Sequence, residues 1–139
     1  MKGYLSIDIL DDNNNVIEHR EGENAIAANY ATVMALAMSN NAYLNVLLLG
    51  TGSNTTNPES MTALQNETLR IPIDLSKCIS IDGKVAVNIV TPVAYSVKDI
   101  TEFGLAAEIG SRTILFNYKA LEQKFTKNGK ISLKWTIQF

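Results

Sequence analysis

The last nine residues of the chain alternate between apolar and polar side chains. Ile131, Leu133, Trp135, Ile137 and Phe139 fall on one side of an extended backbone, and every residue between them is polar. A period of two is typical of a strand that buries one face and exposes the other. One-sided strands of this kind are characteristic of antiparallel sheets. The C-terminal segment therefore favours an antiparallel β fold.

Other segments carry strand and turn signals at short intervals. Residues 5–9 alternate in the same way and run into the Asp/Asn turn at 11–15, which predicts an N-terminal hairpin over residues 3–20. Residues 44–49 are continuously apolar, as in a central strand buried on both faces. Pro72 suits an edge strand, and Asp82-Gly83 favours a type I′ hairpin turn. We expect about eight short strands.

One long helix is expected over residues of about 24–39. Asn24 suits an N-cap, and Ile26, Tyr30 and Val33 recur at helical spacing. The other side of this segment is also largely apolar, so we expect contact on both sides.

The predicted fold is mainly β: an antiparallel β-sandwich with this helix packed on it. The whole chain, 1–139, forms a single domain, in which the N-terminal hairpin and helix occupy 1–41 and the sandwich occupies 42–139. The expected core contains apolar residues from each of these parts: Ile26, Tyr30, Val33, Leu48, Phe103, Leu105, Phe116, Leu133, Trp135 and Ile137.

Charge and composition argue against several classes of partner. The net charge is −2, so no overall positive field attracts a nucleic acid or an anionic membrane. The most apolar stretch, 25–38, is shorter than the about 20 residues that a membrane span needs. Ser6 and Asp8 interrupt any signal-peptide core, so we expect synthesis in the cytoplasm without export. The single cysteine, Cys78, excludes an intramolecular disulfide.

The sequence predicts no metal or cofactor site. The 11–15 turn resembles a calcium loop, but Val16 and Gly22 stand where that loop needs glycine and glutamate. Gly50-Thr51-Gly52 follows a strand, yet Thr55 occupies the third glycine position of a dinucleotide-binding loop. Both segments are better interpreted as turns.

No catalytic residues are predicted either. His19 is the only histidine and lies in the N-terminal hairpin among charged neighbours, where a surface imidazole is expected. Glu102 and Glu108 share one face of a predicted strand, so an acid pair is conceivable in principle, but a solvated edge is the commoner arrangement.

Charge is concentrated at the two ends of the chain. Residues 1–24 hold six acidic side chains against two basic ones, and residues 119–134 hold five lysines against Glu122. These segments are either solvated patches that lie near one another in the fold or complementary contacts between subunits. The candidate interface residues are Asp11, Asp12, Glu18, Lys124, Lys127 and Lys130.

The order of these elements resembles that of small structural proteins of tailed bacteriophages. The resemblance covers nearly the whole chain. It lies in the hairpin and alanine-rich helix, the strand ending Leu48-Leu49-Gly50-Thr51-Gly52, the Thr/Asn/Pro loop before Arg70, and the segments 100–105, 114–116 and 133–137. The hairpin at 78–90 is more regular than expected for that group.

The resemblance implies a non-enzymatic virion part, associated with tail, fibre or baseplate, made in the cytoplasm of a host bacterium. Its implied partners are further copies of itself and other virion proteins. Two alternatives remain open within this setting: a head decoration or head–tail connector protein, and a sandwich that binds host glycans through tyrosines such as Tyr43 or Tyr95. An enzyme of unknown type is a third hypothesis.

Overall fold

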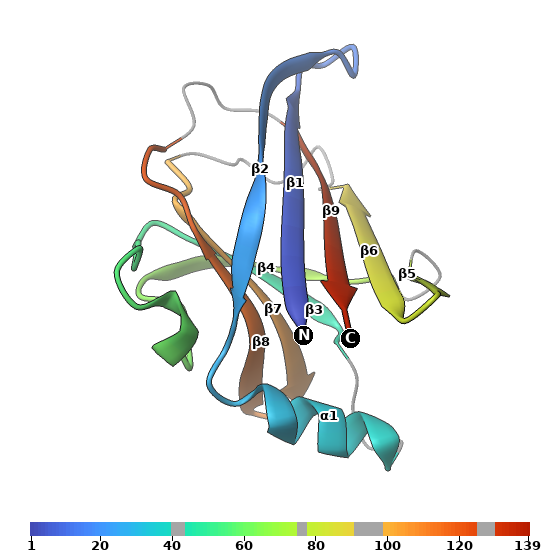
Figure 1. The fold of residues 1–139 in the computed structure, drawn as a ribbon. Coiled ribbons are helices and arrows are strands. Elements are labelled where there is room, and N and C mark those ends of the chain that lie inside the picture. Colours follow the sequence, from blue (N-terminus) through green and yellow to red (C-terminus); the bar gives the residue numbers. More distant parts are fainter. Residues whose placement is uncertain (40–43, 75–77, 91–98, 125–129) are drawn as a thin grey trace.

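A computed structural model describes residues 1–39, 44–74, 78–90, 99–124 and 130–139. Tyr43, Tyr95 and Lys127 lie outside these ranges. Within them the strands form one antiparallel sheet in the order β4-β3-β7-β8-β2-β1-β9-β6-β5, curled into a half-barrel (Figure 1). The elements in chain order are β1 (Lys2–Leu10), β2 (Val16–Ile26), α1 (Tyr30–Met38), β3 (Val46–Gly50), the 3-10 turn η1 (Pro58–Ser60), β4 (Glu67–Pro72), β5 (Cys78–Ile81), β6 (Lys84–Val90), β7 (Glu102–Ile109), β8 (Arg112–Ala120) and β9 (Lys130–Gln138).

The mainly β, antiparallel prediction is confirmed, but the structure is not a clear sandwich. The two halves of the sheet are joined by β2, whose last two residues pair with β8. Alternating apolar residues show only that one face of a strand is buried. They do not distinguish two packed sheets from one sheet that curls around its own core.

The prediction of a long helix from about residue 24 is wrong. Asn24 pairs with Gly3 in the β1–β2 ladder, and Ile26 is the last residue of β2. The helix α1 has nine residues, and the N-cap position belongs to Asn29. Strand pairing satisfies the backbone groups of residues 24–26, so the tertiary contacts override the helical spacing of the side chains.

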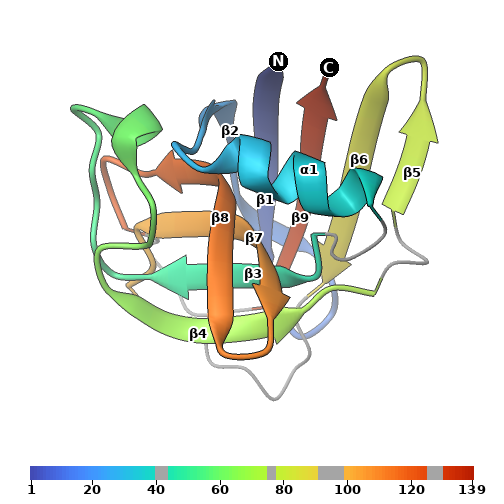
Figure 2. The ribbon, with the colours of Figure 1, turned by 90° about the horizontal axis from the view of Figure 1, so that it is seen from below.

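The helix α1 lies across one end of the half-barrel (Figure 2). Val33 is its one buried residue, and Met34 and Leu36 pack against the core. Tyr30 is 38% exposed and Ile26 is half-buried, so their placement in the core was wrong. Contact on both sides of the helix was also wrong, because Ala28, Ala31 and Ala35 on its other side are exposed.

Eight of the ten expected core residues are buried: Val33, Leu48, Phe103, Leu105, Phe116, Leu133, Trp135 and Ile137. Most of them belong to a cluster inside the curl, to which β1, β9, β7 and β3 contribute alternate residues. A second, smaller cluster lies on the opposite face of β3, β7 and β8, where Leu64 and Met61 cover it. This second layer explains why β3 is apolar at every position up to Gly50 and buried throughout.

Three local predictions are confirmed. Pro72 ends β4, which is an edge strand of the sheet. Asp82 and Gly83 both have positive φ, 53° and 74°, as a type I′ turn between β5 and β6 requires. In the first hairpin, the Asp11 carboxylate accepts hydrogen bonds from the backbone N–H groups of Asn13 and Asn15, both at 2.9 Å.

Candidate functional site

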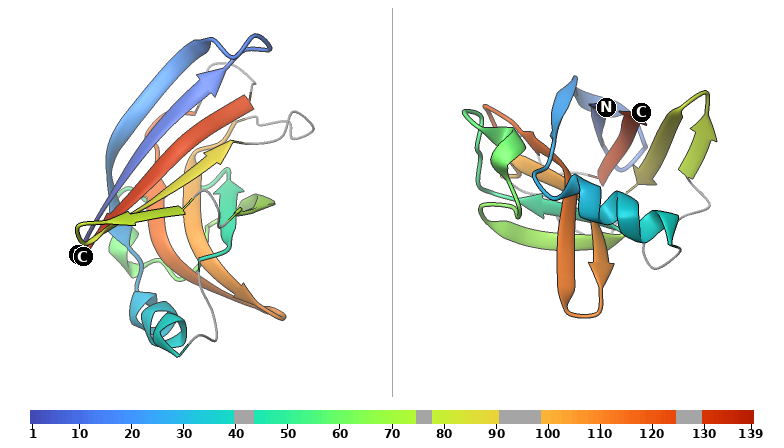
Figure 3. Two further views of the ribbon diagram at one scale, coloured as in Figure 1. Left: turned by 90° about the vertical axis from the view of Figure 1, so that its right-hand side faces the viewer. Right: turned by 60° about the horizontal axis from the view of Figure 1, so that its bottom comes forward.

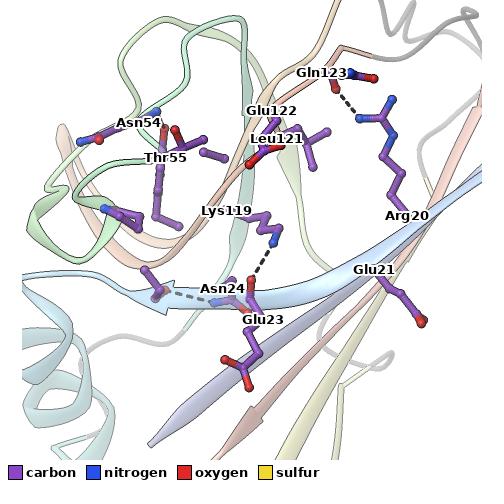
Figure 4. Close-up of a pocket in the computed structure, with 14 residues that line it drawn as sticks. Arg20, Glu21, Glu23, Asn24, Asn54, Thr55, Lys119, Leu121, Glu122 and Gln123 are labelled. Atoms are coloured by element: carbon purple, nitrogen blue, oxygen red, sulfur yellow. Dashed lines mark hydrogen bonds between the residues drawn. The ribbon is translucent and has the colours of Figure 1, made fainter.

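The sheet divides between β2 and β8, and a polar cleft lies at the division. The two strands pair only through Ala25 with Tyr118 and Ile26 with Asn117, and then they separate (Figure 1). The cleft has a volume of about 600 Å³. Its lining comes from β2, the loop after β3, and the end of β8 with the residues that follow it (Figure 4).

Two basic side chains bridge the gap in place of a backbone ladder. The Lys119 ammonium donates a hydrogen bond to the Glu23 carbonyl at 2.7 Å. The Arg20 guanidinium donates a hydrogen bond to the Gln123 carbonyl (Figure 4). It also donates to the Lys124 carbonyl and pairs with Glu18 at 2.8 Å. Partial burial lowers the pKa of Lys119.

The polar character of the cleft arises because alternate residues of β2 face it, and these residues are polar. Glu18, Arg20, Gly22 and Asn24 pair with residues of β1 that face the interior, such as Ile7, so they lie on the inner side of the curl. Gly22 leaves room for Lys119, because a Cβ at this position would lie 3.0 Å from the Lys119 Nζ atom.

Asn24 also holds the core. Its Oδ1 atom accepts a hydrogen bond from the indole N–H of the buried Trp135 at 3.0 Å. The residue expected to cap a helix therefore provides the polar partner that a buried tryptophan needs.

The groups around the cleft are suited to hydrogen bonding with a polar ligand. Asn54, Thr55 and Glu122 line it, and Glu21 and Glu23 border it from β2 with side chains that point to the opposite face of that strand (Figure 4). In the part of the chain that the structure describes, no group of three or more His, Cys, Asp or Glu residues could hold a metal ion. The arrangement suits a small ligand with several hydroxyl or amide groups.

Among the described residues, the most completely buried charged group is Glu102, at the start of β7, which is 0% exposed. Its Oε1 atom accepts hydrogen bonds from the Gln65 N–H at 2.9 Å and the Tyr118 hydroxyl at 2.8 Å. Its Oε2 atom accepts from the N–H groups of Gly52 at 3.0 Å and Asn66 at 2.7 Å. The carboxylate thus fastens the loop between β3 and β4 to the sheet.

Gly50, the last residue of β3, and Gly52 make room for this carboxylate. A Cβ would lie 2.6 Å from the Glu102 Oε2 atom at Gly50 and 2.7 Å from it at Gly52. Side chains at these positions would displace Glu102, so the two glycines serve a close structural contact. The interpretation of 50–52 as a tight turn was wrong, because Gly50 is the last residue of β3 and pairs with both neighbouring strands. Burial raises the pKa of Tyr118, which keeps its hydroxyl protonated as a donor.

Glu102 and Glu108 do not form an acid pair. They are six residues apart on β7, which is about 20 Å along a strand. Glu108 is exposed and pairs with Arg70 at 2.6 Å. Glu102 is occupied by four donors, so neither carboxylate faces the other.

His19 lies on the outer surface of the first hairpin, as expected for a surface imidazole. Its Nδ1 and Nε2 atoms lie 2.5 Å from Asp8 and 3.1 Å from Glu21. The hydrogen bond to Asp8, with a smaller contribution from Glu21, raises the pKa of His19. Cys78 lines an apolar pocket with Val85 and Phe139, and burial raises the pKa of its thiol.

The acidic and basic segments are neighbours within one chain. Strand β1, which belongs to the acidic segment 1–24, pairs with the lysine-bearing β9 along its length, from Lys2 with Gln138 to Leu10 with Lys130. Lys130 donates a hydrogen bond to Asn14 in the first turn. These contacts favour the interpretation of two adjacent patches over a contact between subunits for this pair of segments.

The candidate interface residues differ in their surroundings. Asp12 and Lys124 are exposed, and Lys124 lies 3.6 Å from Asp99. Asp11 is half-buried in its own turn, and Glu18 pairs with Arg20. The candidate interface residues that the structure describes do not form one continuous surface of free charges.

The carboxylate at Glu102 was not recognised from the sequence as a structural anchor. Two signals were present: an acidic residue at the start of an apolar strand, and two glycines one residue apart after a buried strand. The donors that explain them come from positions 52, 65, 66 and 118, which only the fold brings together.

Comparison of the chain with protein-family profiles, with curated proteins and with solved structures gives no significant match. Among the described residues, no helix has both the length and the apolar character needed to cross a membrane.

Proposed function

We propose that this protein is a non-enzymatic structural component of a bacteriophage virion, associated with tail, fibre or baseplate, that acts through repeated protein–protein contacts. One observation carries the proposal: large apolar side chains stand exposed at the ends and edge of the half-barrel. Met38, Ile81, Val90, Phe139 and Ile79 are between 51% and 85% exposed. Exposed apolar surface of this kind is typical of surfaces that partners cover.

The two edges of the sheet support the same conclusion. The β4 edge carries Pro72 and an ion pair between Arg70 and Glu67 at 2.6 Å, devices that discourage pairing with another strand. The β5 edge, with the sequence Cys-Ile-Ser-Ile, carries neither proline nor charge, and its two isoleucines are exposed. An edge of this kind accepts a neighbouring chain.

The polar groups of the cleft also fit a structural role. Lys119, Arg20 and Asn24 are engaged in holding the divided sheet together, and Glu102 holds a loop. The resemblance to small phage structural proteins points in the same direction.

The proposal is tested by locating the protein in particles. Particles are purified from lysates of the host bacterium, and their proteins are quantified by mass spectrometry. We expect this chain in a fixed ratio to the main structural proteins, at several copies per particle. Absence from intact particles would refute the proposal, and separation of heads from tails would distinguish a tail part from a head decoration or connector protein.

A glycan-binding module is the second candidate, favoured by the polar cleft of about 600 Å³. Its amide and carboxylate groups are of the type that hydrogen-bond sugar hydroxyls. A glycan array separates the two functions. Saturable binding that is lost in Asn54→Ala or Glu122→Ala would favour the glycan module, and no binding is expected of an assembly component.

A further inference from the structure

The outer face of one half of the sheet has an ordered distribution of charge. This outer face is formed by alternate residues of β2, β1, β9, β6 and β5, whose intervening residues point into the core. On one side of this face, β2 and β1 lie side by side (Figure 3) and carry Asp8, Glu21 and Glu23, with His19 between Asp8 and Glu21 and with Lys2 at the start of β1. On the β9 and β6 side it carries Lys134 and Lys84.

The cross-strand register shows how the charges change across the face. One row runs Glu21, Ser6, Lys134 and Asn88 from β2 to β6. The next row runs Glu23, Tyr4, Thr136, Ala86 and Ile79 from β2 to β5. The face is therefore acidic on one side, basic near the middle and apolar at the β5 edge.

We propose that the outer face binds the outer face of a second copy of this chain about a twofold axis. The inference rests on the proposed assembly function, and it names the surface and the partner. The occupant is a second copy because the face is complementary to itself in charge and has the size of a stable interface.

Charge complementarity fixes the direction of the axis. A twofold axis parallel to the strands, between β1 and β9, places β2 of one copy over β6 of the other and β1 over β9. Glu21 and Lys134 lie at the same level of the sheet, both in line with Ser6. The axis therefore brings Glu21 of one copy to within about one strand spacing, 4.8 Å, of the position over Lys134 of the other.

Glu23 follows the same rule, whereas Lys2 of β1, which lies in line with Gln138 and Lys84, comes within about one strand spacing of the position over Lys84. The axis places the acidic strand that carries Glu23 over the strand that carries Lys84. An axis perpendicular to the strands would instead lay each strand over itself and set like charges against each other. The first arrangement therefore brings more opposite charges together than the second.

The area of the face suits a dimer. Five strands about 4.8 Å apart, with about eight residues rising about 3.3 Å each, cover roughly 600 Å² in plan. Side chains that project from the sheet increase the accessible surface, which approaches the about 800 Å² per partner of a standard interface. Sheets also pack face to face as a common rule, about 10 Å apart.

The face has apolar anchors and hollows that receive them. Tyr4 is 42% exposed near its centre, and Ile79 and Ile81 are 51% and 63% exposed at its edge. One hollow of about 270 Å³ lies beside Tyr4, and another of about 450 Å³ lies beside Ile79 and Ile81. Tyrosine is among the residues most often found at the energetic centre of interfaces.

The test measures the dimer dissociation constant of the full-length chain by sedimentation equilibrium. The double variant Lys84→Glu with Lys134→Glu should weaken self-association at least 100-fold. The reciprocal variant Glu21→Lys with Glu23→Lys should weaken it similarly, and an equimolar mixture of the two variants should form heterodimers. Salt at about 1 M should weaken the wild-type dimer, because it shortens the Debye length to about 3 Å.

Control variants make charge reversals of the same kind at positions outside the outer face. Glu59→Lys in η1 and Arg112→Glu at the start of β8 are exposed and lie outside the face, so they should leave the dimer intact. If the lysine variants fail to fold, Ile81→Asp in the turn-proximal part of β5 provides a second disruption of the same face, and it should also yield monomers.

Three results would overturn the inference: a monomeric wild type at about 100 µM and low salt, undiminished association in both double variants, or failure of their mixture to associate. These outcomes are separable from failure of the proposed function. A chain found in particles but monomeric in solution refutes the twofold contact alone. A chain that dimerises through this face but is absent from particles refutes the virion role alone.

Discussion

Replacing Glu102 by glutamine tests the central structural contact of the molecule. The change keeps the shape of the side chain but converts one acceptor oxygen into an amide donor and removes the charge. Both oxygens of Glu102 accept two hydrogen bonds each, so neither orientation of the amide avoids a conflict. The less harmful orientation places the amide nitrogen against the Gln65 N–H and the Tyr118 hydroxyl.

The magnitude follows from these four contacts. The Tyr118 hydroxyl can rotate to accept a hydrogen bond, but the Gln65 N–H loses its acceptor, which costs about 1–3 kcal/mol for a buried donor. The bonds from Gly52 and Asn66 change from charge-assisted to neutral, which roughly halves their strength. The desolvation cost of the carboxylate is relieved in part. We expect a net loss of about 2–4 kcal/mol in the free energy of unfolding.

Urea denaturation followed by tryptophan fluorescence measures this loss, because Trp135 is the only tryptophan and is fully buried. Glu108→Gln is the matched control. Glu108 lies on the same strand but is exposed and paired with Arg70, so its replacement should cost less than about 1 kcal/mol.

Hydrogen exchange supplies a local measurement. The amides of Gly52, Gln65 and Asn66 should exchange faster in Glu102→Gln than in the wild type, while amides of β1 and β9 keep their order of protection. If Glu102→Gln unfolds within about 1 kcal/mol of the wild type, or if these three amides keep their protection, Glu102 does not fasten the loop and the reasoning is wrong.

Three further predictions concern single side chains. Trp135→Ala should reduce the free energy of unfolding by about 3–5 kcal/mol, measured by circular dichroism in urea, and a loss below about 1 kcal/mol would contradict its core position. Asn117→Leu should raise the melting temperature, because both amide atoms of this buried side chain have no hydrogen-bond partner among the described residues; a lower melting temperature would show that the amide is satisfied. The raised pKa of His19 means that the stability from its contacts with Asp8 and Glu21 is fully present below the ordinary value of 6.5 and is lost as the pH rises through the raised value. The stability difference between wild type and His19→Gln should therefore shrink as the pH rises above the ordinary pKa of 6.5, and a difference that grows with pH would contradict the assignment.

Local patterns predicted much of the secondary structure because they reflect interactions between residues close in sequence. The alternation of residues 131–139 specified a one-sided strand, and β9 buries each of its odd-numbered residues from Ile131 to Ile137. Asp82-Gly83 specified a turn with two positive φ angles, and Pro72 marked an edge. Each of these signals depends on backbone geometry within a few residues.

The same reasoning was wrong at residues 24–26, where a helical pattern of side chains competes with a strand partner about ninety residues away. The ladder between β2 and β8 and the indole of Trp135 hold these residues extended. A sequence pattern contains no information about such a partner, so the start of α1 was placed too early.

The sequence by itself determined that this protein is an antiparallel β protein, where most of its strands run and which faces they bury, since alternation and turn chemistry are local. Only the tertiary structure decided that the strands form one curled sheet, that the sheet divides between β2 and β8, and that Glu102 meets four donors from distant positions. The physical reason is that a buried apolar face needs other apolar residues and a buried carboxylate needs hydrogen-bond donors. The tertiary fold alone decides which residues supply them.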